Sequence, residues 1–150
     1  AMLAEARHGD SRCLGIWLQG KLAAYGWFKT NCVPSEHCLG AGIELPADCA
    51  YHFKAFTHPA FRGRRLHALV LAAGSARLAV EGFRAVLVVV ERSNRASHRS
   101  TRHAGCRELG SLSVWGTAGR FGVQFPPAAG ELGIRFTPGM TGPAKSSSLA

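Results

Sequence analysis

Apolar residues near the start of the chain fall in short runs that predict β-strands. Residues 14–18 and 22–28 are two such runs, and Gln19-Gly20-Lys21 between them is typical of a hairpin turn. Residues 51–57 carry aromatic side chains two and three positions apart, which predicts a further strand. Pro59 ends that strand, because proline supplies no N–H group to a sheet ladder. We therefore expect antiparallel strands in this part of the chain.

A long amphipathic helix is predicted over residues 66–81, with Gly82 at the position of a C-terminal cap. Gly74 within this helix should lower its stability slightly, since glycine is a weak helix former. The next apolar run, residues 85–90, is rich in valine, as in a central strand covered on both faces. The apolar stripe of the helix is predicted to comprise Leu66, Leu69, Val70, Ala73, Ala76 and Val80.

The rest of the chain predicts a second helix and more short strands. Asn94 can cap a basic helix that runs to about His103. Short strands are expected at residues 39–45, 109–115, 121–125 and 132–136. Residues 138–150, rich in Gly, Pro and Ser, predict a disordered tail. The order of elements indicates one domain of mixed α/β (α+β) class over residues 1–137.

Composition restricts the function classes only loosely. The chain has 150 residues and a formal net charge of +9, which attracts polyanions of several kinds. Arginine gathers at residues 62–65 and 92–102, each beside the start of a predicted helix, which favours a compact phosphate group. The five cysteines are odd in number and form no Cys-x-x-Cys pair, so neither a disulfide framework nor a metal site is expected. The chain has no apolar run of membrane-spanning length and residues 1–10 have no signal-peptide core, so we expect a cytoplasmic protein without membrane contact.

The loop Arg62-Gly63-Arg64-Arg65-Leu66-His67 carries the clearest chemistry. A loop that opens a helix can bind pyrophosphate through backbone N–H groups, and the helix dipole strengthens that binding. Gly63 permits a tight turn, and the three arginines can form charge-assisted bonds to phosphate oxygens. The alternative is a basic helix start on a solvated surface.

Residues 56–67 closely resemble the cofactor-binding motif of the Gcn5-related N-acetyltransferases (GNAT family). In that motif a strand and a short proline-containing segment precede Gln or Arg, two residues, Gly, one residue, then Gly or Ala. Asn94, Ser97 and residues 102–106 resemble the family's next motif. The resemblance implies a GNAT-like acyl-CoA N-acyltransferase fold with a mostly antiparallel central sheet and a long cofactor-binding helix. It implies acetyl-CoA as co-substrate, no metal, and direct transfer of acetyl to a primary amine in a ternary complex.

Under this resemblance the cofactor contacts fall on named positions. Arg62 is the first position of the motif, and the loop and helix start would face the pyrophosphate. Backbone groups of Phe56 and Thr57 would pair with the pantetheine arm as an added strand does. Asn94 and Ser97 would lie near the far end of pantetheine, although Asn94 is equally explained as a helix cap. The loop residues in contact with the cofactor would be Arg62, Gly63, Arg64, Arg65, Leu66 and His67.

The sequence departs from the family pattern in four places. Arg65 replaces the first glycine of the motif and His67 replaces its final Gly or Ala. Thr101 stands where many members have a tyrosine acid, and a threonine hydroxyl is a poor acid. Only about a dozen residues precede the hairpin, so the usual first strand and two helices are expected to be missing. An uncovered sheet edge would favour a homodimer, unless residues 1–9 fold back as a short helix.

Candidates for the catalytic base are Glu44, His52, His58 and Glu91, since an amine must lose its proton before it attacks a thioester. The acceptor is not readable from the sequence, although the basic surface disfavours a polybasic substrate. Two other functions remain open: a catalytically impaired CoA-binding fold, and a basic nucleic-acid-binding module.

Overall fold

A computed structural model describes residues 2–30, 32–33, 42–117 and 120–137 of the protein. These residues group into two compact units. The first is built from Ala1–Cys32 and Leu45–Glu108, and the second from Val33–Glu44 and Leu109–Ala150.

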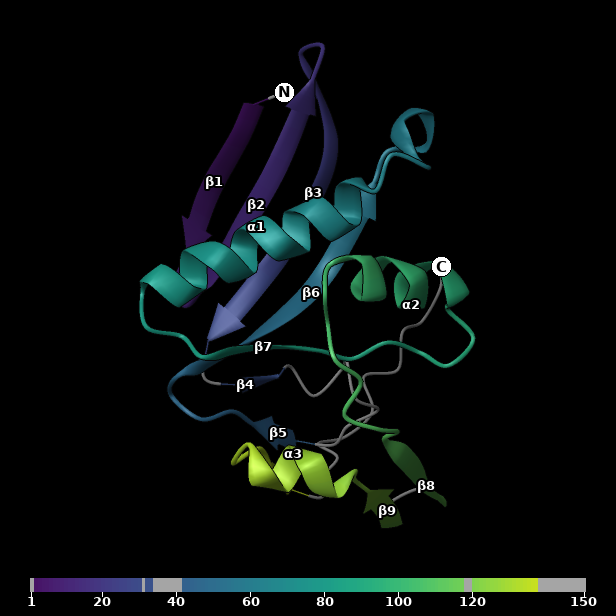
Figure 1. The fold of residues 1–150 in the computed structure, drawn as a ribbon. Coiled ribbons are helices and arrows are strands. Elements are labelled where there is room, and N and C mark those ends of the chain that lie inside the picture. The colour runs from purple at the N-terminus through teal and green to yellow at the C-terminus, as the bar shows by residue number, and fades with distance from the viewer. Residues whose placement is uncertain (1, 31, 34–41, 118–119, 138–150) are drawn as a thin grey trace, which may run out of the picture. The chain divides into compact units, whose positions relative to one another are not determined.

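The first unit contains a five-stranded sheet with the order β1-β2-β3-β6-β7 (Figure 1). Its neighbouring strands are antiparallel except β6 and β7, which are parallel. This confirms the mixed α/β class and the mostly antiparallel central sheet. The strands are β1 (Met2–His8), β2 (Ser11–Leu18), β3 (Lys21–Thr30), β6 (Cys49–Thr57) and β7 (Ala85–Val88).

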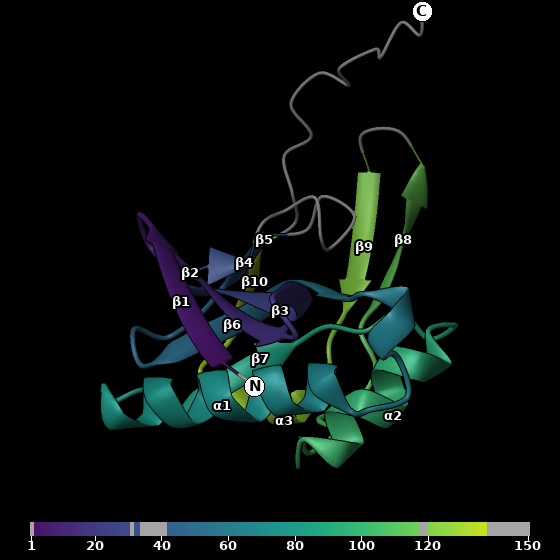
Figure 2. The ribbon, with the colours of Figure 1, turned by 90° about the horizontal axis from the view of Figure 1, so that it is seen from above.

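Helix α1 (Leu66–Val80) lies across one face of this sheet (Figure 2). A short 3-10 turn, η2 (Pro59–Phe61), precedes it, and α2 (Arg95–His103) follows β7 and contacts α1. The packing is closest at Gly74, where an added Cβ would overlap the ring of buried Phe28. Gly74 therefore lets the helix approach the sheet, which explains a glycine in the middle of a helix. The core cluster consists of Leu14, Ile16, Ala23, Ala24, Phe28, Ala50, Phe61, Leu66, Val70, Leu71 and Leu78.

The buried stripe of α1 differs from the predicted one. Leu69 is 53% exposed and Val80 is 90% exposed, whereas Leu71 and Leu78 are buried. The buried face follows positions 66, 70, 74 and 78, four residues apart, because Gly74 must face Phe28. The prediction that Leu69, Ala76 and Val80 face the core was wrong.

The leading segment of the chain forms a strand. β1 pairs antiparallel along β2, from Met2 opposite Trp17 to His8 opposite Ser11. The strand covers the outer edge of β2, so the expectation of an uncovered hairpin edge and the alternative of a short helix were both wrong. One outer edge of the five-stranded sheet is therefore β1, and the other is β7.

The second unit contains short strands and one short helix. A three-stranded sheet has the order β10-β5-β4, and β8 and β9 form an antiparallel pair. The strands expected at residues 109–115, 121–125 and 132–136 are present with shifted ends, and the strand expected at 39–45 is described only over its second part. Residues 138–150, the expected tail, lie outside the described residues. The elements are β4 (Cys32–Val33), β5 (Gly42–Glu44), β8 (Ser113–Thr117), β9 (Arg120–Gln124), α3 (Pro127–Glu131) and β10 (Arg135–Thr137).

Among the described residues no helix has both the length and the apolar character that crossing a membrane requires. Four cysteines are free thiols in this part of the chain, namely Cys13, Cys32, Cys49 and Cys106.

Candidate active site

The parallel strands β6 and β7 pair over only part of their length. Their pairing runs from Cys49 opposite Ala85 to His52 opposite Val88, where β7 ends. Strand β6 continues to Thr57, and within the described ranges no other strand pairs with this outer edge. An exposed strand edge of this kind can bind an extended ligand through backbone hydrogen bonds, as an added strand would.

A β-bulge lies in β6 immediately beyond the point where β7 ends. Trp27 of β3 pairs with Phe53 and Tyr25 pairs with Phe56, so two residues of β6 oppose Gly26 alone. Lys54 within the bulge has φ +45°, a left-handed conformation that is uncommon for a residue with a side chain. A bulge turns the local backbone away from the ladder, and N–H groups turned in this way are available to a ligand.

The loop from β6 to α1 is shaped by two residues with positive φ. Gly63 has φ +77° and Arg65, the N-cap of α1, has φ +57°. Arg65 provides no side-chain cap, so the first N–H groups of α1 have no partner from it. The left-handed conformation at Arg65 explains why the motif has glycine at this position. The first turn contains no acidic residue, so the positive end of the helix dipole is not neutralised there.

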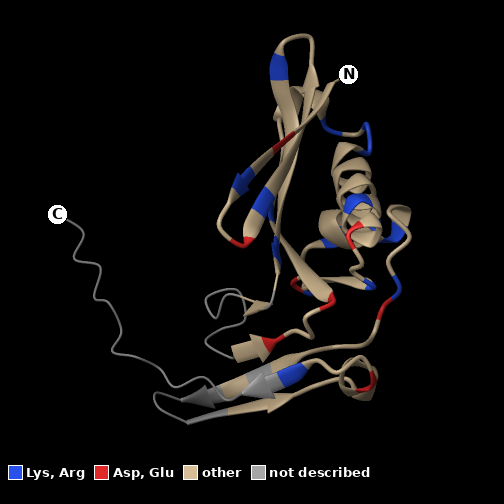
Figure 3. Ribbon diagram, turned by 90° about the vertical axis from the view of Figure 1, so that its left-hand side faces the viewer, with Lys and Arg blue, Asp and Glu red and all other residues tan. Residues whose placement is uncertain are grey.

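The arginines of this loop are exposed and basic residues cluster there (Figure 3). The Arg62 Nε donates to the Thr57 carbonyl oxygen at 3.4 Å, which ties the loop to the end of β6. The Arg64 guanidinium lies 5.5 Å from the centre of the Phe61 ring. The His58 Nδ1 accepts a hydrogen bond from the Ala60 N–H, so His58 caps the 3-10 turn. The loop therefore presents positive charge on a backbone held by its own side chains.

His52 and His67, both singled out from the sequence, are in contact. Their Nε2 atoms are 3.1 Å apart and their rings stack at 5.4 Å between centroids. His52 is buried against the β3 backbone, where an added Cβ on Gly26 would overlap its ring. Its Nδ1 is buried without a hydrogen-bond partner among the described residues. The His67 ring, at the position of the motif's last Gly or Ala, is therefore directed towards His52.

The environment makes both histidines weak bases. The pKa of His52 is lowered from 6.5 to about 3. Burial is the larger cause and the neighbouring His67 is the smaller one, while the Trp27 backbone acts in the opposite direction. Burial also lowers the pKa of His67. Both rings are therefore neutral at physiological pH.

The second motif begins at the cap of α2. The Asn94 side chain accepts a hydrogen bond from the Ser97 N–H at 3.0 Å, which is the helix-cap role. The buried Thr101 hydroxyl donates to the His98 carbonyl oxygen at 3.1 Å. That bond occupies the Thr101 proton within the helix, and Thr101 has no exposed hydroxyl to act as an acid.

The remaining candidates lie in different places. Glu91 is exposed, three residues beyond the end of β7. Glu44 is exposed at the end of β5, in the second compact unit. Phe56 is partly exposed, and its ring lies 5.6 Å from that of Tyr25. The structure thus brings together Phe56, Thr57, the loop and the His52–His67 pair, and it leaves Glu44 in the other unit.

Sequence reasoning missed the bulge at Lys54 and the role of Gly26. A glycine inside a predicted strand often marks a bulge or a close approach of another group, and Gly26 does both. That signal was present in the strand predicted over residues 22–28.

Several solved acetyltransferase structures are similar in fold to this chain. Aminoglycoside N-acetyltransferase AAC(6')-Iy in complex with CoA has a TM-score of 0.56 and 14% identity, over 72% of this chain and 76% of that chain. The same enzyme with the bisubstrate analog CoA-S-monomethyl-acetylneamine has a TM-score of 0.58 and 14% identity, over 73% and 71%. Ribosomal-protein-alanine N-acetyltransferase from Brucella melitensis biovar Abortus has a TM-score of 0.53 and 12% identity, over 73% and 72%.

No protein-family model and no curated protein sequence matches the chain. The likeness is therefore one of structure. The chain has the fold of the Gcn5-related N-acetyltransferases.

Proposed function

We propose that this protein is an acetyl-CoA-dependent N-acetyltransferase that acts on a primary amine. The observation that carries the proposal is the separation of β6 from β7 beyond His52, next to the bulge at Lys54. The outer edge of β6 leads directly into the loop that opens α1. One extended ligand with a pyrophosphate at one end and an amide-containing arm fits both features.

In this proposal different residues bind different parts of the ligand. Backbone N–H groups of the loop and the first helical turn bind the pyrophosphate, and Arg62, Arg64 and Arg65 add positive charge. Backbone groups of Phe56 and Thr57 pair with the pantetheine arm. Asn94 and Ser97 hold the start of α2 beside it. The backbone contacts of the loop fall at Gly63, Arg64, Leu66 and His67.

Acetyl-CoA supplies a thioester carbonyl that an amine attacks, with release of CoA as a thiol. N–H groups turned outward by the bulge at Lys54 suit the carbonyl oxygen, which gains negative charge during the attack. His52 is a weak base because it is buried and its pKa is about 3. The exposed carboxylate of Glu91, just beyond β7, is therefore the best candidate to remove the proton from the amine, through a water molecule. Glu44, in the second unit, is the remaining carboxylate candidate.

A second candidate function is a fold that binds CoA without transfer. The observation that favours it is Thr101, whose hydroxyl is bonded inside α2 and replaces the usual tyrosine acid. Detection of free CoA thiol during incubation with acetyl-CoA and a panel of small amines, amino acids and peptides separates the two functions. Thiol release with any amine supports the transferase, whereas tight acetyl-CoA binding without release from any amine supports the second function.

A further inference from the structure

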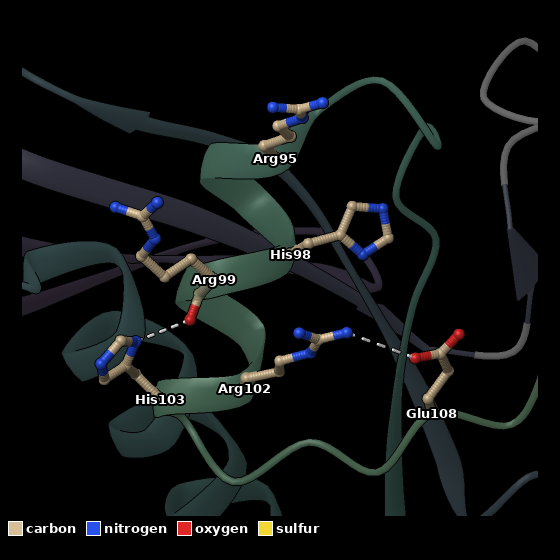
Figure 4. A pocket seen from close by; sticks show the side chains of 6 residues that line it. All are labelled: Arg95, His98, Arg99, Arg102, His103 and Glu108. Carbon is tan, nitrogen blue, oxygen red and sulfur yellow. Dashed lines mark hydrogen bonds and ion pairs between the residues drawn. The ribbon is translucent and has the colours of Figure 1, made fainter.

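Helix α2 carries an unusual density of basic side chains. Five of its nine residues are arginine or histidine. Arg95, Arg99 and His103 form one row at a spacing of four residues, and His98 and Arg102 form another. Figure 4 shows Arg99 and His103 on one side of the helix and His98 and Arg102 on the other. A surface pocket of about 440 Å³ is lined by these five residues and Glu108. We call this the α2 basic furrow.

Little negative charge neutralises the furrow. Arg102 lies 3.8 Å from Glu108, but their side chains are 75% and 70% exposed, so the pair contributes little. His103 Nδ1 lies 2.7 Å from the Arg99 carbonyl oxygen, and His98 Nε2 lies 3.2 Å from the Glu91 carbonyl oxygen. Both histidine rings are therefore held by backbone groups. Within the described residues, Arg95 and Arg99 form no ion pair.

Arg102 and His103 in the last turn suit the negative end of the helix dipole, but the arginines in the first half of α2 do not stabilise the helix. Arg95 is the first residue of α2, where the helix dipole disfavours a cation, and the first turn has no acidic residue. Arg95 and Arg99, four residues apart, repel each other by about 0.2–0.5 kcal/mol. In the five-stranded sheet and α1, by contrast, Arg7, Arg12 and Arg77 pair with carboxylates, as Arg77 does with Glu5 at 2.6 Å. Arg95 and Arg99 are therefore better explained by an anionic partner than by folding.

We infer that the α2 basic furrow binds the sugar–phosphate backbone of a nucleic acid strand, independently of the proposed acetyl transfer. From Arg95 to Arg102 the helix rises about 10 Å, so its fixed charges extend over more than one phosphate group. The lining contains no phenylalanine, tyrosine or tryptophan, and its two histidine rings are held by backbone carbonyl oxygens. The furrow therefore contacts phosphates and does not read sequence.

The test is fluorescence anisotropy of a labelled single-stranded oligonucleotide titrated with the full chain at several salt concentrations. If three arginines neutralise three phosphates, log K falls with log salt with a slope of about −2. The variant Arg95→Gln/Arg99→Gln keeps good helix formers, so circular dichroism should be unchanged. Its affinity should fall about tenfold or more at low salt, and its slope should decrease to about −0.7. The matched control, Lys21→Gln/Arg135→Gln, removes two exposed charges outside α2 and should retain wild-type affinity and slope.

Three results would overturn the inference. One is the absence of binding at low salt, including the case in which the protein binds anionic vesicles but no oligonucleotide. Another is an equal loss of affinity in the control variant, which would mean that only net charge matters. The third is displacement of the oligonucleotide by one equivalent of CoA, which would assign the furrow to the cofactor.

Discussion

The buried His52 should make the fold sensitive to acid. In the native state its ring lies between the β3 backbone, Phe28 and His67, with Nδ1 unpaired. Protonation there would place a charge in the core beside a second imidazole. The unfolded chain has no such penalty, so acid favours unfolding.

The magnitude follows from the pKa of His52, which falls from 6.5 to about 3 on folding. Because the folded-state pKa is the lower one, the unfolded chain binds the proton first and stability falls as the pH drops below 6.5. The loss is about 2 kcal/mol at pH 5 and about 4 kcal/mol at pH 3, and it approaches about 5 kcal/mol below pH 3. The lowered pKa of His67 adds a loss in the same direction.

Urea unfolding of the wild type and of His52→Leu at pH 7.5 and pH 5 measures this contribution. Between the two pH values the wild type should lose about 2 kcal/mol more than His52→Leu. A control, Leu71→Ala, removes a buried apolar side chain and should be less stable at both pH values. Its loss between them should equal that of the wild type. Identical pH dependence in the wild type and His52→Leu would refute the reasoning.

Three other changes test the structure at separate points. Gly63→Glu should abolish acetyl-CoA binding, because it places negative charge against the phosphates. Gly20→Glu, at a similar positive φ in a distant turn, should bind acetyl-CoA normally. Calorimetry measures both affinities, and equal affinities would mean that the loop at Gly63 does not bind the cofactor. Gly74→Ala should lower the melting temperature, because overlap with the Phe28 ring costs about 1–3 kcal/mol against a gain of about 1 kcal/mol in helix propensity. A higher melting temperature would mean that Phe28 can move. Sedimentation should show self-association through the outer edge formed by Met2–His8, and a monomer at high concentration would contradict it.

The central part of the fold was predictable from local sequence patterns. The strand over residues 51–57, the loop at Arg62, the helix from Leu66 and the strand after Ala85 are all present. The prediction that residues 85–90 form a central strand covered on both faces was wrong, because β7 is an edge strand of its sheet and its residues are only half-buried. Each of these elements follows from a property of adjacent residues: a proline that ends a strand, a 3.6-residue apolar period, and a valine-rich run. The predicted C-terminal cap of the helix also lies at its end, where Gly82 has φ +93°.

Features that depend on distant residues were not predictable in this way. Met2–His8 has no strong strand pattern, and it is a strand because β2 offers a partner. The orientation of α1 depends on Phe28 meeting Gly74 across the interface. The contact between His52 and His67 joins a strand to a helix, and neither local pattern indicates it.

The most direct test is calorimetric titration with acetyl-CoA and, separately, with ADP, which lacks the pantetheine arm. If the outer edge of β6 binds that arm, acetyl-CoA should bind with one site per chain and at least about tenfold more tightly than ADP, a difference of about 1.4 kcal/mol. Both affinities should weaken as salt rises, because the loop before α1 binds phosphate through charge. No heat and no thermal shift at millimolar acetyl-CoA, or equal affinity for the two ligands, would contradict the proposed site.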